Sequence, residues 1–490
     1  MKNEGQKIIS RVGIYGAGRL IRGLSSFLML PIYTRFLSPA DYGTIELLNM
    51  AIDFAAMLFG ARITVGMFRF YQQEKDPQNK KKVITTSLYI TTLLNTLCII
   101  TLALFSTQLS QLLFGEEGYT LAFSLFSLTL LLGAVSEVGM GYLRILDRPY
   151  IYVGLSLVRL LLQLGLNIYF IVIQELTFMG VIYSAVISSA TMAIGLSTYI
   201  LAKNGLKANW ELIKPMIIFS LPIILASLAM FFIAFGDRYL LRIYHSIEVI
   251  GIYALAYKFG TILFDLIWSP FMTYWESKQY DYTENPEGKK QIAATFRYMS
   301  IVLIFAAIGI SIFSKEVIYI MADPSFHNAT SMVPFITFAY LFQAWSDYHR
   351  IGLLHTGKTK YIAYSTYITA GIIAILYFLL IPAYGAYGAA IATAIAMFCR
   401  FYLTYYWSQR ALFIPYKLAS TYTLLLIAII STFAIVTLDV SVMNFFIKLF
   451  LYLTLIIGIF YSPFIEQNVR DQIISVLNQF RNKFTFLSRQ

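Results

Sequence analysis

Charged residues are scarce in this chain: Asp, Glu, Lys and Arg together make up 13% of its 490 residues. A soluble protein of ordinary composition has about 25%. Several windows instead contain about 20 consecutive apolar residues, the length that crosses a hydrocarbon core about 30 Å thick. These runs exclude a soluble globular protein, and they exclude an outer-membrane barrel, whose strands alternate polar and apolar residues. We therefore expect an all-α integral membrane protein.

Residues that carry chemistry are also few. The two cysteines, Cys98 and Cys399, lie far apart in apolar stretches, which argues against a disulfide or a metal pair. No glycine-rich nucleotide-binding loop is present. The longest loop on the side poor in Lys and Arg, about residues 314–331, contains no recognisable catalytic constellation. We therefore expect no enzyme, no catalytic residues, no cofactor and no metal.

About fourteen membrane spans are predicted from the apolar windows. They lie near 12–36, 43–68, 83–106, 119–141, 150–173, 178–201, 215–236, 249–272, 297–321, 332–354, 361–382, 387–407, 418–437 and 444–463.

Positive charge is distributed unequally between the two sides of these spans. The net charge is +12, and roughly 25 of the 37 Lys and Arg belong to one set of alternate loops and to the two termini. The other side has only Arg35, Arg238, Arg242 and Lys315. The positive-inside rule therefore predicts that both termini are cytoplasmic and that the number of spans is even. The charge reflects orientation in the membrane, so we expect no nucleic acid partner.

The two halves of the chain resemble each other. Three short motifs recur after 208, 211 and 208 residues, which predicts two lobes, each of six spans. We expect an N-lobe over 1–206, a C-lobe over 207–410, two extra helices over 411–465, and a cytoplasmic amphipathic tail over 466–490. The repeated motifs are Ser38–Gly43 with Ser246–Gly251, Arg148–Ile151 with Thr359–Ile362, and Gly180–Ala185 with Gly388–Thr393.

Eight cations fall inside the predicted spans, where each costs about 2.5–3.5 kcal/mol at mid-depth. Such groups are retained when they pair, reach the membrane surface, or line water. Four of them lie deep and outnumber nearby acids, so we predict that they bind an anionic substrate. These four are Arg19, Arg22, Arg62 and Lys258, and the remaining four are Arg159, Arg350, Arg400 and Lys448.

The remaining four cations lie where pairing or a short path to the membrane surface can accommodate them. Lys448 is close to the end of its span and is expected to extend to the membrane surface. For Arg350 and Arg400 a structural pairing role is favoured over a role in substrate binding, and Asp347 and His349 lie beside Arg350. Arg159 has Asp53 across the lobe as a candidate partner, so a structural ion pair and a functional role are both open for it.

Acids also lie within or at the ends of the predicted spans, namely Asp53, Glu137, Asp237, Asp265 and Asp347. Asp265 is seven residues after Lys258 and so on the same helix face. Asp53, Glu137, Asp237 and Asp265 either couple transport to H⁺ or Na⁺ or serve as structural partners of Arg and Lys.

Two segments resemble a known family. The end of the first span and the segment after it, Leu28–Gly43, is similar to the opening of bacterial polysaccharide flippases of the Wzx type, in the multidrug/oligosaccharidyl-lipid/polysaccharide exporter superfamily. Asp237–Tyr239 and Gly251–Lys258 resemble the junction of spans 7 and 8 in the same family. The resemblance implies two six-helix lobes around a central cavity that opens alternately to either side. It also implies a polyprenyl-diphosphate-linked oligosaccharide as substrate, in a bacterial cytoplasmic membrane, with membrane lipids, a polysaccharide polymerase and chain-length machinery as partners.

Other functions fit parts of the pattern. A multidrug extruder shares the lobes but would favour buried acids over cations. A lipid II flippase also fits the span number and the cations, although Leu28–Gly43 is more similar to the oligosaccharide branch. A membrane polysaccharide polymerase or glycosyltransferase would need a larger outer loop or acids near a membrane face.

Overall fold

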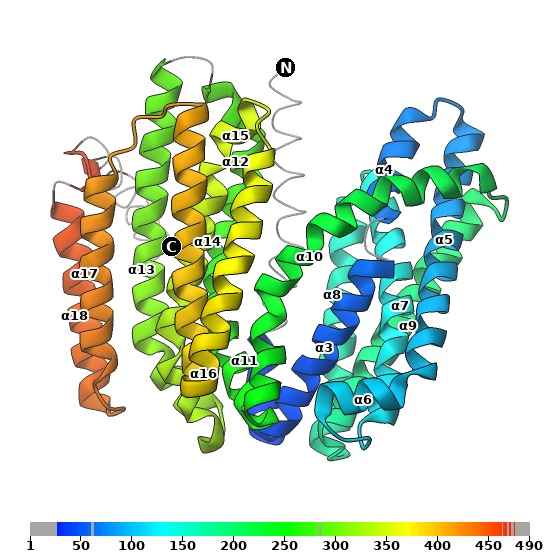
Figure 1. Ribbon diagram of the computed structural model, residues 1–490, viewed down its shortest axis with the longest axis horizontal. Coiled ribbons are helices and arrows are strands. Elements are labelled where there is room, and N and C mark those ends of the chain that lie inside the picture. The colour runs from blue at the N-terminus through cyan, green and yellow to red at the C-terminus, as the bar shows by residue number, and fades with distance from the viewer. Residues whose placement is uncertain are drawn as a thin grey trace, which may run out of the picture.

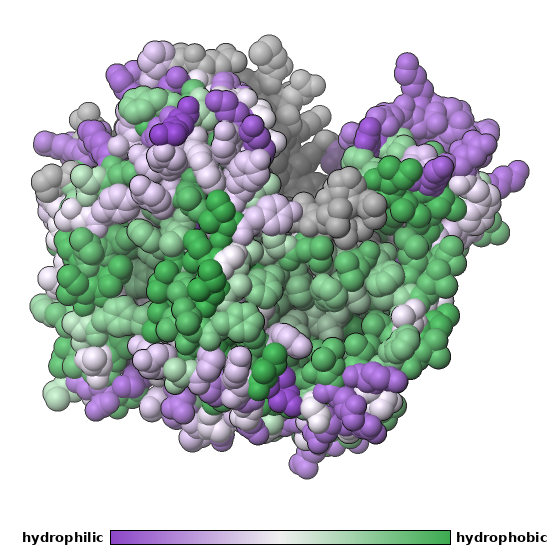
Figure 2. Space-filling model, in the orientation of Figure 1, coloured by the Kyte–Doolittle hydropathy of each residue, from purple (hydrophilic) through white to green (hydrophobic). Residues whose placement is uncertain are grey.

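A computed structural model of the chain describes residues 27–59, 63–283, 286–462, 464–467, 470, 471 and 475. All regular secondary structure within these residues is helical. Ten helical runs among them are long and apolar enough to cross a membrane. Figure 2 shows an apolar belt around the middle of the molecule, with hydrophilic residues gathered at its two ends. The all-α membrane fold predicted from the sequence is confirmed.

The first half of the described chain forms one helical bundle, which Figure 1 shows in blue and cyan. Its elements are α2 (Leu30–Phe36), α3 (Pro39–Phe59), α4 (Ile63–Gln73), α5 (Pro77–Leu104), α6 (Ser106–Phe114), α7 (Thr120–Ile145), α8 (Pro149–Asn167), η1 (Ile168–Ile173), α9 (Thr177–Asn204) and η2 (Trp210–Leu212).

The second half forms another bundle, and α10 runs diagonally between the two (Figure 1). Helices α17 and α18 lie at its outer edge, away from the first bundle. The elements are α10 (Ile213–Tyr244), α11 (Ile247–Ile262), η3 (Leu263–Trp268), α12 (Ser269–Lys278), η4 (Gln279–Tyr282), α13 (Pro286–Met321), η5 (Pro324–Ser331), α14 (Val333–His349), α15 (Ile351–His355), α16 (Lys360–Ala411), α17 (Leu418–Val436) and α18 (Val442–Tyr461).

The predicted spans from the second to the last coincide with these helices, whereas most of the first, 12–36, lies outside the described residues. Helix α16 contains two of the predicted spans. They meet at Gly385, whose φ of 55° and ψ of −135° break the helix at a backbone conformation that favours glycine. The total of fourteen spans and the lobe boundaries remain predictions.

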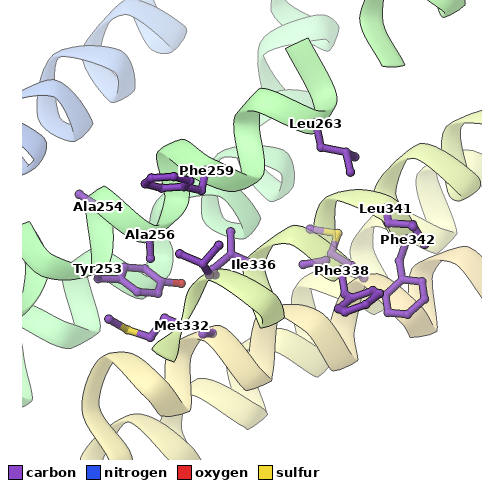
Figure 3. Close-up of a cluster of buried hydrophobic side chains, with 14 of the residues drawn as sticks. Tyr253, Ala254, Ala256, Phe259, Leu263, Met332, Ile336, Phe338, Leu341 and Phe342 are labelled. Atoms are coloured by element: carbon purple, nitrogen blue, oxygen red, sulfur yellow. The ribbon is translucent and has the colours of Figure 1, made fainter. Parts of the chain in front are cut away.

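The core of the second bundle holds α11 in place. Tyr253, Ala256 and Phe259 of α11 and Leu263 of η3 are buried, and Figure 3 shows them facing side chains of α14 such as Ile336. Helices in a membrane are held together by close packing of such side chains, and not by transfer of the side chains from water. The packing therefore fixes the orientation of α11, which carries Lys258 one residue before Phe259.

Lys448 does not extend to the membrane surface, so that prediction is wrong. Its side chain is fully buried, and its Nζ lies 2.5 Å from Glu316 Oε1 of α13. The sequence placed Lys448 by its distance from the end of a helix, but the face that packs against α13 decides its environment. The pair attaches α18 to the second bundle.

Most of the predicted amphipathic tail lies outside the described residues. Its first residue, Glu466, accepts a hydrogen bond of 2.6 Å from Arg297 Nη2 of α13. This hydrogen bond lowers the pKa of Glu466 below its ordinary value. The contact holds the start of the segment against the second bundle.

Candidate functional site

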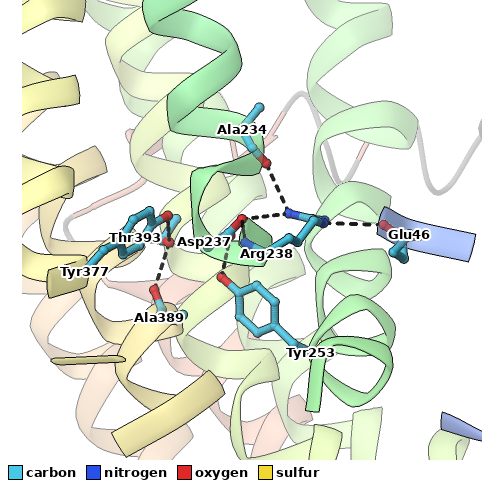
Figure 4. A network of polar contacts seen from close by, with 8 residues as sticks. All are labelled: Glu46, Ala234, Asp237, Arg238, Tyr253, Tyr377, Ala389 and Thr393. Carbon is cyan, nitrogen blue, oxygen red and sulfur yellow. Dashed lines mark hydrogen bonds and ion pairs between the residues drawn. The ribbon is translucent and has the colours of Figure 1, made fainter. Parts of the chain in front are cut away.

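A buried network of charged residues joins the two bundles. Arg238 of α10 lies between two acids: its Nε is 3.4 Å from Glu46 Oε2 of α3, and its Nη1 is 3.0 Å from Asp237 Oδ1. Tyr253 of α11 donates a hydrogen bond of 2.8 Å to Asp237 Oδ2. Figure 4 shows Arg238 reaching across from α10 toward α3. The network therefore links the first bundle to the second in the apolar interior.

Lys258 belongs to the same network. Its Nζ lies 3.7 Å from Glu46 Oε1, so Glu46 contacts two cations at once. The two acids Glu46 and Asp237 balance the two cations Arg238 and Lys258. Buried charges are tolerated when they are paired and hydrogen-bonded in this way.

The Lys258 cavity, of about 220 Å³, lies in the first bundle, where that bundle meets α11 of the second. Glu46 and Asn49 line it from α3, Gln163 from α8, and Lys258 reaches it from α11 of the other bundle. Amide, carboxylate and ammonium groups therefore converge on one space, where they can bind a polar group by hydrogen bonds and charge. Tyr33 also lines the cavity, and its hydroxyl accepts a hydrogen bond of 3.0 Å from Asn167.

A second cavity, the Arg400 cavity, lies in the second bundle and has a volume of about 150 Å³. Tyr257 of α11, Tyr340 and Gln343 of α14, and Thr393 and Arg400 of α16 line it. Tyr257 and Lys258 are adjacent in sequence, so the two cavities lie on either side of α11. Each cavity contains one cation at its wall.

Of the four predicted substrate-binding residues, only Lys258 can be placed. Arg19, Arg22 and Arg62 lie outside the described residues. Lys258 lines a cavity and forms an ion pair with Glu46, whereas Asp265, seven residues further along the chain, is exposed in η3. The prediction about which residues bind the substrate stays a prediction.

The other charged residues of the spans occupy different places. Arg350, the residue that follows α14, has its Nη2 3.2 Å from Oδ1 of Asp347, which lies in the last turn of α14. Asp53 is exposed on α3, two turns beyond Glu46, and forms no ion pair with another described residue. Arg159 is half-buried on α8. In the described part of the chain, no cluster of three or more His, Cys, Asp or Glu is arranged to hold a metal.

Two residues of the network were missed in the sequence. Arg238 was assigned to a loop because span 7 was expected to end at 236, but α10 continues to Tyr244 and buries it. Glu46 was not considered because it stood at the edge of the expected span 43–68, whereas α3 begins at Pro39. The two segments that resemble the flippase family could have pointed to these residues. Leu28–Gly43 ends three residues before Glu46, and Asp237–Tyr239 includes Arg238.

Comparison with known proteins identifies a family that matches the sequence and solved structures that share the fold. Residues 32–331 match the model of a family described as polysaccharide biosynthesis protein. No curated protein matches the chain significantly in sequence. A solved structure of the lipid II flippase MurJ in an inward closed conformation is similar, with a TM-score of 0.73, 12% identity, and coverage of 92% of this chain and 99% of that one.

Multidrug transporters of the MATE family are similar as well. An inward-facing structure has a TM-score of 0.62 and 14% identity, covering 85% of this chain and 99% of that one. An outward-facing structure has a TM-score of 0.58 and 13% identity, covering 84% and 96%. Both are transporters of the multidrug/oligosaccharidyl-lipid/polysaccharide exporter superfamily. The chain therefore belongs to the polysaccharide biosynthesis protein family and has the transporter fold of that superfamily, as its motifs indicated.

Proposed function

We propose that this chain is a flippase of the Wzx type, which moves a polyprenyl-diphosphate-linked oligosaccharide from the cytoplasmic to the outer leaflet of a bacterial cytoplasmic membrane. The substrate is a repeat unit of O-antigen, capsule or exopolysaccharide. The membership in a polysaccharide biosynthesis family carries the proposal, together with the Lys258 cavity, which both bundles line. The lipid tail stays in the bilayer while the headgroup passes between the lobes.

Alternating access is the proposed mechanism. The two bundles share a fold with transporters of known inward-facing and outward-facing conformations. In the present conformation, charged side chains of α3, α10 and α11 connect the bundles. An anionic headgroup that binds Lys258 competes with Glu46 for the ammonium, and so weakens a contact between the lobes. Binding of substrate and movement of the lobes are thereby coupled.

Either the membrane potential or an ion gradient can drive the proposed transport. A membrane potential acts on a charged headgroup with about 2.3 kcal/mol per charge per 100 mV. Asp53 is exposed on α3 and can serve as a site for H⁺ or Na⁺, whereas Asp237 is paired with Arg238 and accepts a hydrogen bond from Tyr253. Asp53 is therefore the better candidate of the two for ion coupling.

Deletion of the gene tests the function. Lipid-linked oligosaccharide accumulates inside the deletion strain, and polymer disappears from the surface; mass spectrometry of the lipid fraction and staining of surface glycan measure the two effects. Altered dye efflux with normal surface glycan would support a multidrug extruder instead. The similarity to MurJ makes a lipid II flippase the second candidate. Rescue of cells depleted of their lipid II flippase by this chain would favour that function.

Neutralising the proposed binding cations blocks export without preventing membrane insertion. Arg19→Gln, Arg22→Gln, Arg62→Gln and Lys258→Gln remove charges that would contact the diphosphate, and each is expected to reduce surface glycan about tenfold or more, as for a lost charge-assisted contact. Lys290→Gln is the matched control, because Lys290 is exposed and pairs only with Glu287 of its own helix. Unchanged surface glycan in all four variants would refute the binding role.

A further inference from the structure

Arg400 is a buried cation without a carboxylate partner in the described part of the chain. Its side chain is 4% exposed, its Nη2 contacts only Met230 Sδ at 3.8 Å, and its Nε has no hydrogen-bond partner. The nearby acid Asp347 is occupied by Arg350. By contrast, the other two buried Lys and Arg side chains of the described residues, Arg238 and Lys448, are paired with acids. The expectation that Arg400 pairs structurally is therefore not met.

An unpaired buried charge destabilises a fold by several kcal/mol, so Arg400 is costly where it stands. It lies 11 residues before the end of α16, about 16 Å along the helix axis. That depth prevents the guanidinium from reaching the membrane surface as the side chain of a terminal residue would. A buried, unpaired Arg400 is explained if its partner is an anion of a bound ligand and not a side chain of the protein.

We propose that the Arg400 cavity binds an anionic group of the transported headgroup, either the carboxylate of an acidic sugar or a phosphate. A guanidinium binds both groups through two parallel hydrogen bonds. Tyr257 and Tyr340 present aromatic rings beside it, and the Gln343 amide can bond a sugar hydroxyl. The assignment rests on the proposed function for the identity of the ligand, but the binding itself is measurable without transport.

The full-length protein, purified in detergent, tests the site by thermal unfolding. D-Glucuronate and inorganic phosphate are the probes, and D-glucose with sodium chloride at equal ionic strength is the reference. Binding of a probe in excess of its Kd raises the unfolding midpoint of the natural chain by about 2 °C or more. The shift is lost in Arg400→Met and kept in Arg410→Gln, whose guanidinium is exposed on the same helix.

The two probes separate the two sources of the anion. A shift with glucuronate alone assigns the cavity to an acidic sugar, and one with phosphate alone assigns it to the diphosphate. No shift in the natural chain, or an equal shift in Arg400→Met, overturns the site. A surviving anion shift combined with normal surface glycan in the deletion strain would refute the proposed function and leave the site standing.

A second inference comes from contacts on the side that is poor in Lys and Arg. Arg35, at the end of α2, donates hydrogen bonds of 2.9 Å to Ile320 O and 3.3 Å to Met321 O, at the end of α13 in the other bundle. Arg242, at the end of α10, donates to Phe114 O, at the end of α6 in the first bundle. Each arginine therefore crosses between bundles and binds the partially negative carbonyl end of a helix.

These two contacts are related by the internal repeat. Arg35 and Arg242 are 207 positions apart, and so are their acceptors Phe114 and Met321. The offset agrees with the 208 residues found between repeated motifs. The contacts are therefore equivalent under exchange of the two halves, in the manner of a symmetric dimer interface.

The repeated glycines lie at the same interface. A Cβ at Gly43 of α3 would be 2.2 Å from Ile247 O of α11, and a Cβ at Gly251 of α11 would be 2.0 Å from Pro39 O of α3. Only glycine permits such a close approach of the two helices. Figure 1 shows α3 and α11 adjacent at this end of the molecule.

We infer that these contacts form the outer gate, a symmetric closure that must separate when the transporter opens to the outside. The gate is defined by Arg35, Gly43, Arg242 and Gly251. It rests on the proposed alternating access, but its opening is measured without substrate. These charge-assisted hydrogen bonds exist only in the closed state, so loss of both arginines favours the open state at least about tenfold.

Cysteine labelling in cells tests the gate. Gln163→Cys places a reporter in the Lys258 cavity, on a background in which Cys98 and Cys399 are replaced by alanine and serine. A membrane-impermeant maleimide is added outside. The double variant Arg35→Gln, Arg242→Gln is expected to label at least about tenfold faster than the background.

A second variant and a control complete the test. Gly251→Val wedges α3 from α11 and is expected to increase labelling too. Lys315→Gln should leave labelling unchanged, because Lys315 is on the same side but pairs with Asp439 within its own half of the molecule. Labelling equal to the background in both the double arginine variant and Gly251→Val overturns the gate.

Discussion

Replacing Arg238 with methionine is expected to unfold or severely destabilise the protein and to abolish export. The substitution leaves Asp237 fully buried without a cation and leaves Glu46 with Lys258 alone. Removal of one partner of a buried ion pair costs about 3–5 kcal/mol, because the remaining charge is uncompensated. Thermal unfolding of the purified protein and surface glycan in cells measure the two effects.

A double variant separates stability from transport. In Asp237→Asn, Arg238→Met the buried carboxylate is removed together with its cation, so most of the lost stability is expected to return. If the network also positions the lobes for substrate, this variant folds and still fails to export. Normal export by the double variant would show that the network acts on stability alone. A destabilisation below about 1 kcal/mol in Arg238→Met, typical of exposed pairs, would contradict the burial argument itself.

The sequence identified the class of protein because apolar length and charge asymmetry are properties of each segment alone. The helices matched the predicted spans in their centres, but the ends differed by several residues. Ends matter here because Glu46 and Arg238 stand close to them. Hydropathy defines the part of a helix that contacts lipid, whereas a helix continues wherever packing and hydrogen bonds support it. For this reason Arg238, which was assigned to a loop from the sequence, lies instead at the centre of the buried network.

Depth along a helix also proved insufficient to assign roles. Arg400 and Lys448 were both judged by their distance from a helix end, and both are buried. The difference between them is the neighbouring helix: α13 offers Glu316 to Lys448, while no carboxylate pairs with Arg400 in the described structure. Which face of a helix meets which neighbour is a tertiary property. The internal repeat pairs Gly43 with Gly251 in the sequence, and these two glycines lie in contact between α3 and α11.

Replacing Lys448 with methionine is expected to detach α18 from α13 and to destabilise the protein by about 3–5 kcal/mol, because Glu316 remains buried without its cation. Lys448 and Ile459 are the buried residues of α18, so this ion pair is the main polar attachment of the helix. Thermal unfolding in detergent and protease cleavage between α17 and α18 measure the effect.

A neighbouring ion pair offers a matched control. Lys315 precedes Glu316 in sequence and pairs with Asp439, whose side chain is 94% exposed, so Lys315→Gln should cost at most about 1 kcal/mol. The double variant Lys448→Met, Glu316→Gln should regain most of the stability that Lys448→Met loses, since no charge is then left buried. If Lys448→Met and Lys315→Gln have the same small effect, the 2.5 Å contact does not attach α18, and apolar packing against α13 is sufficient.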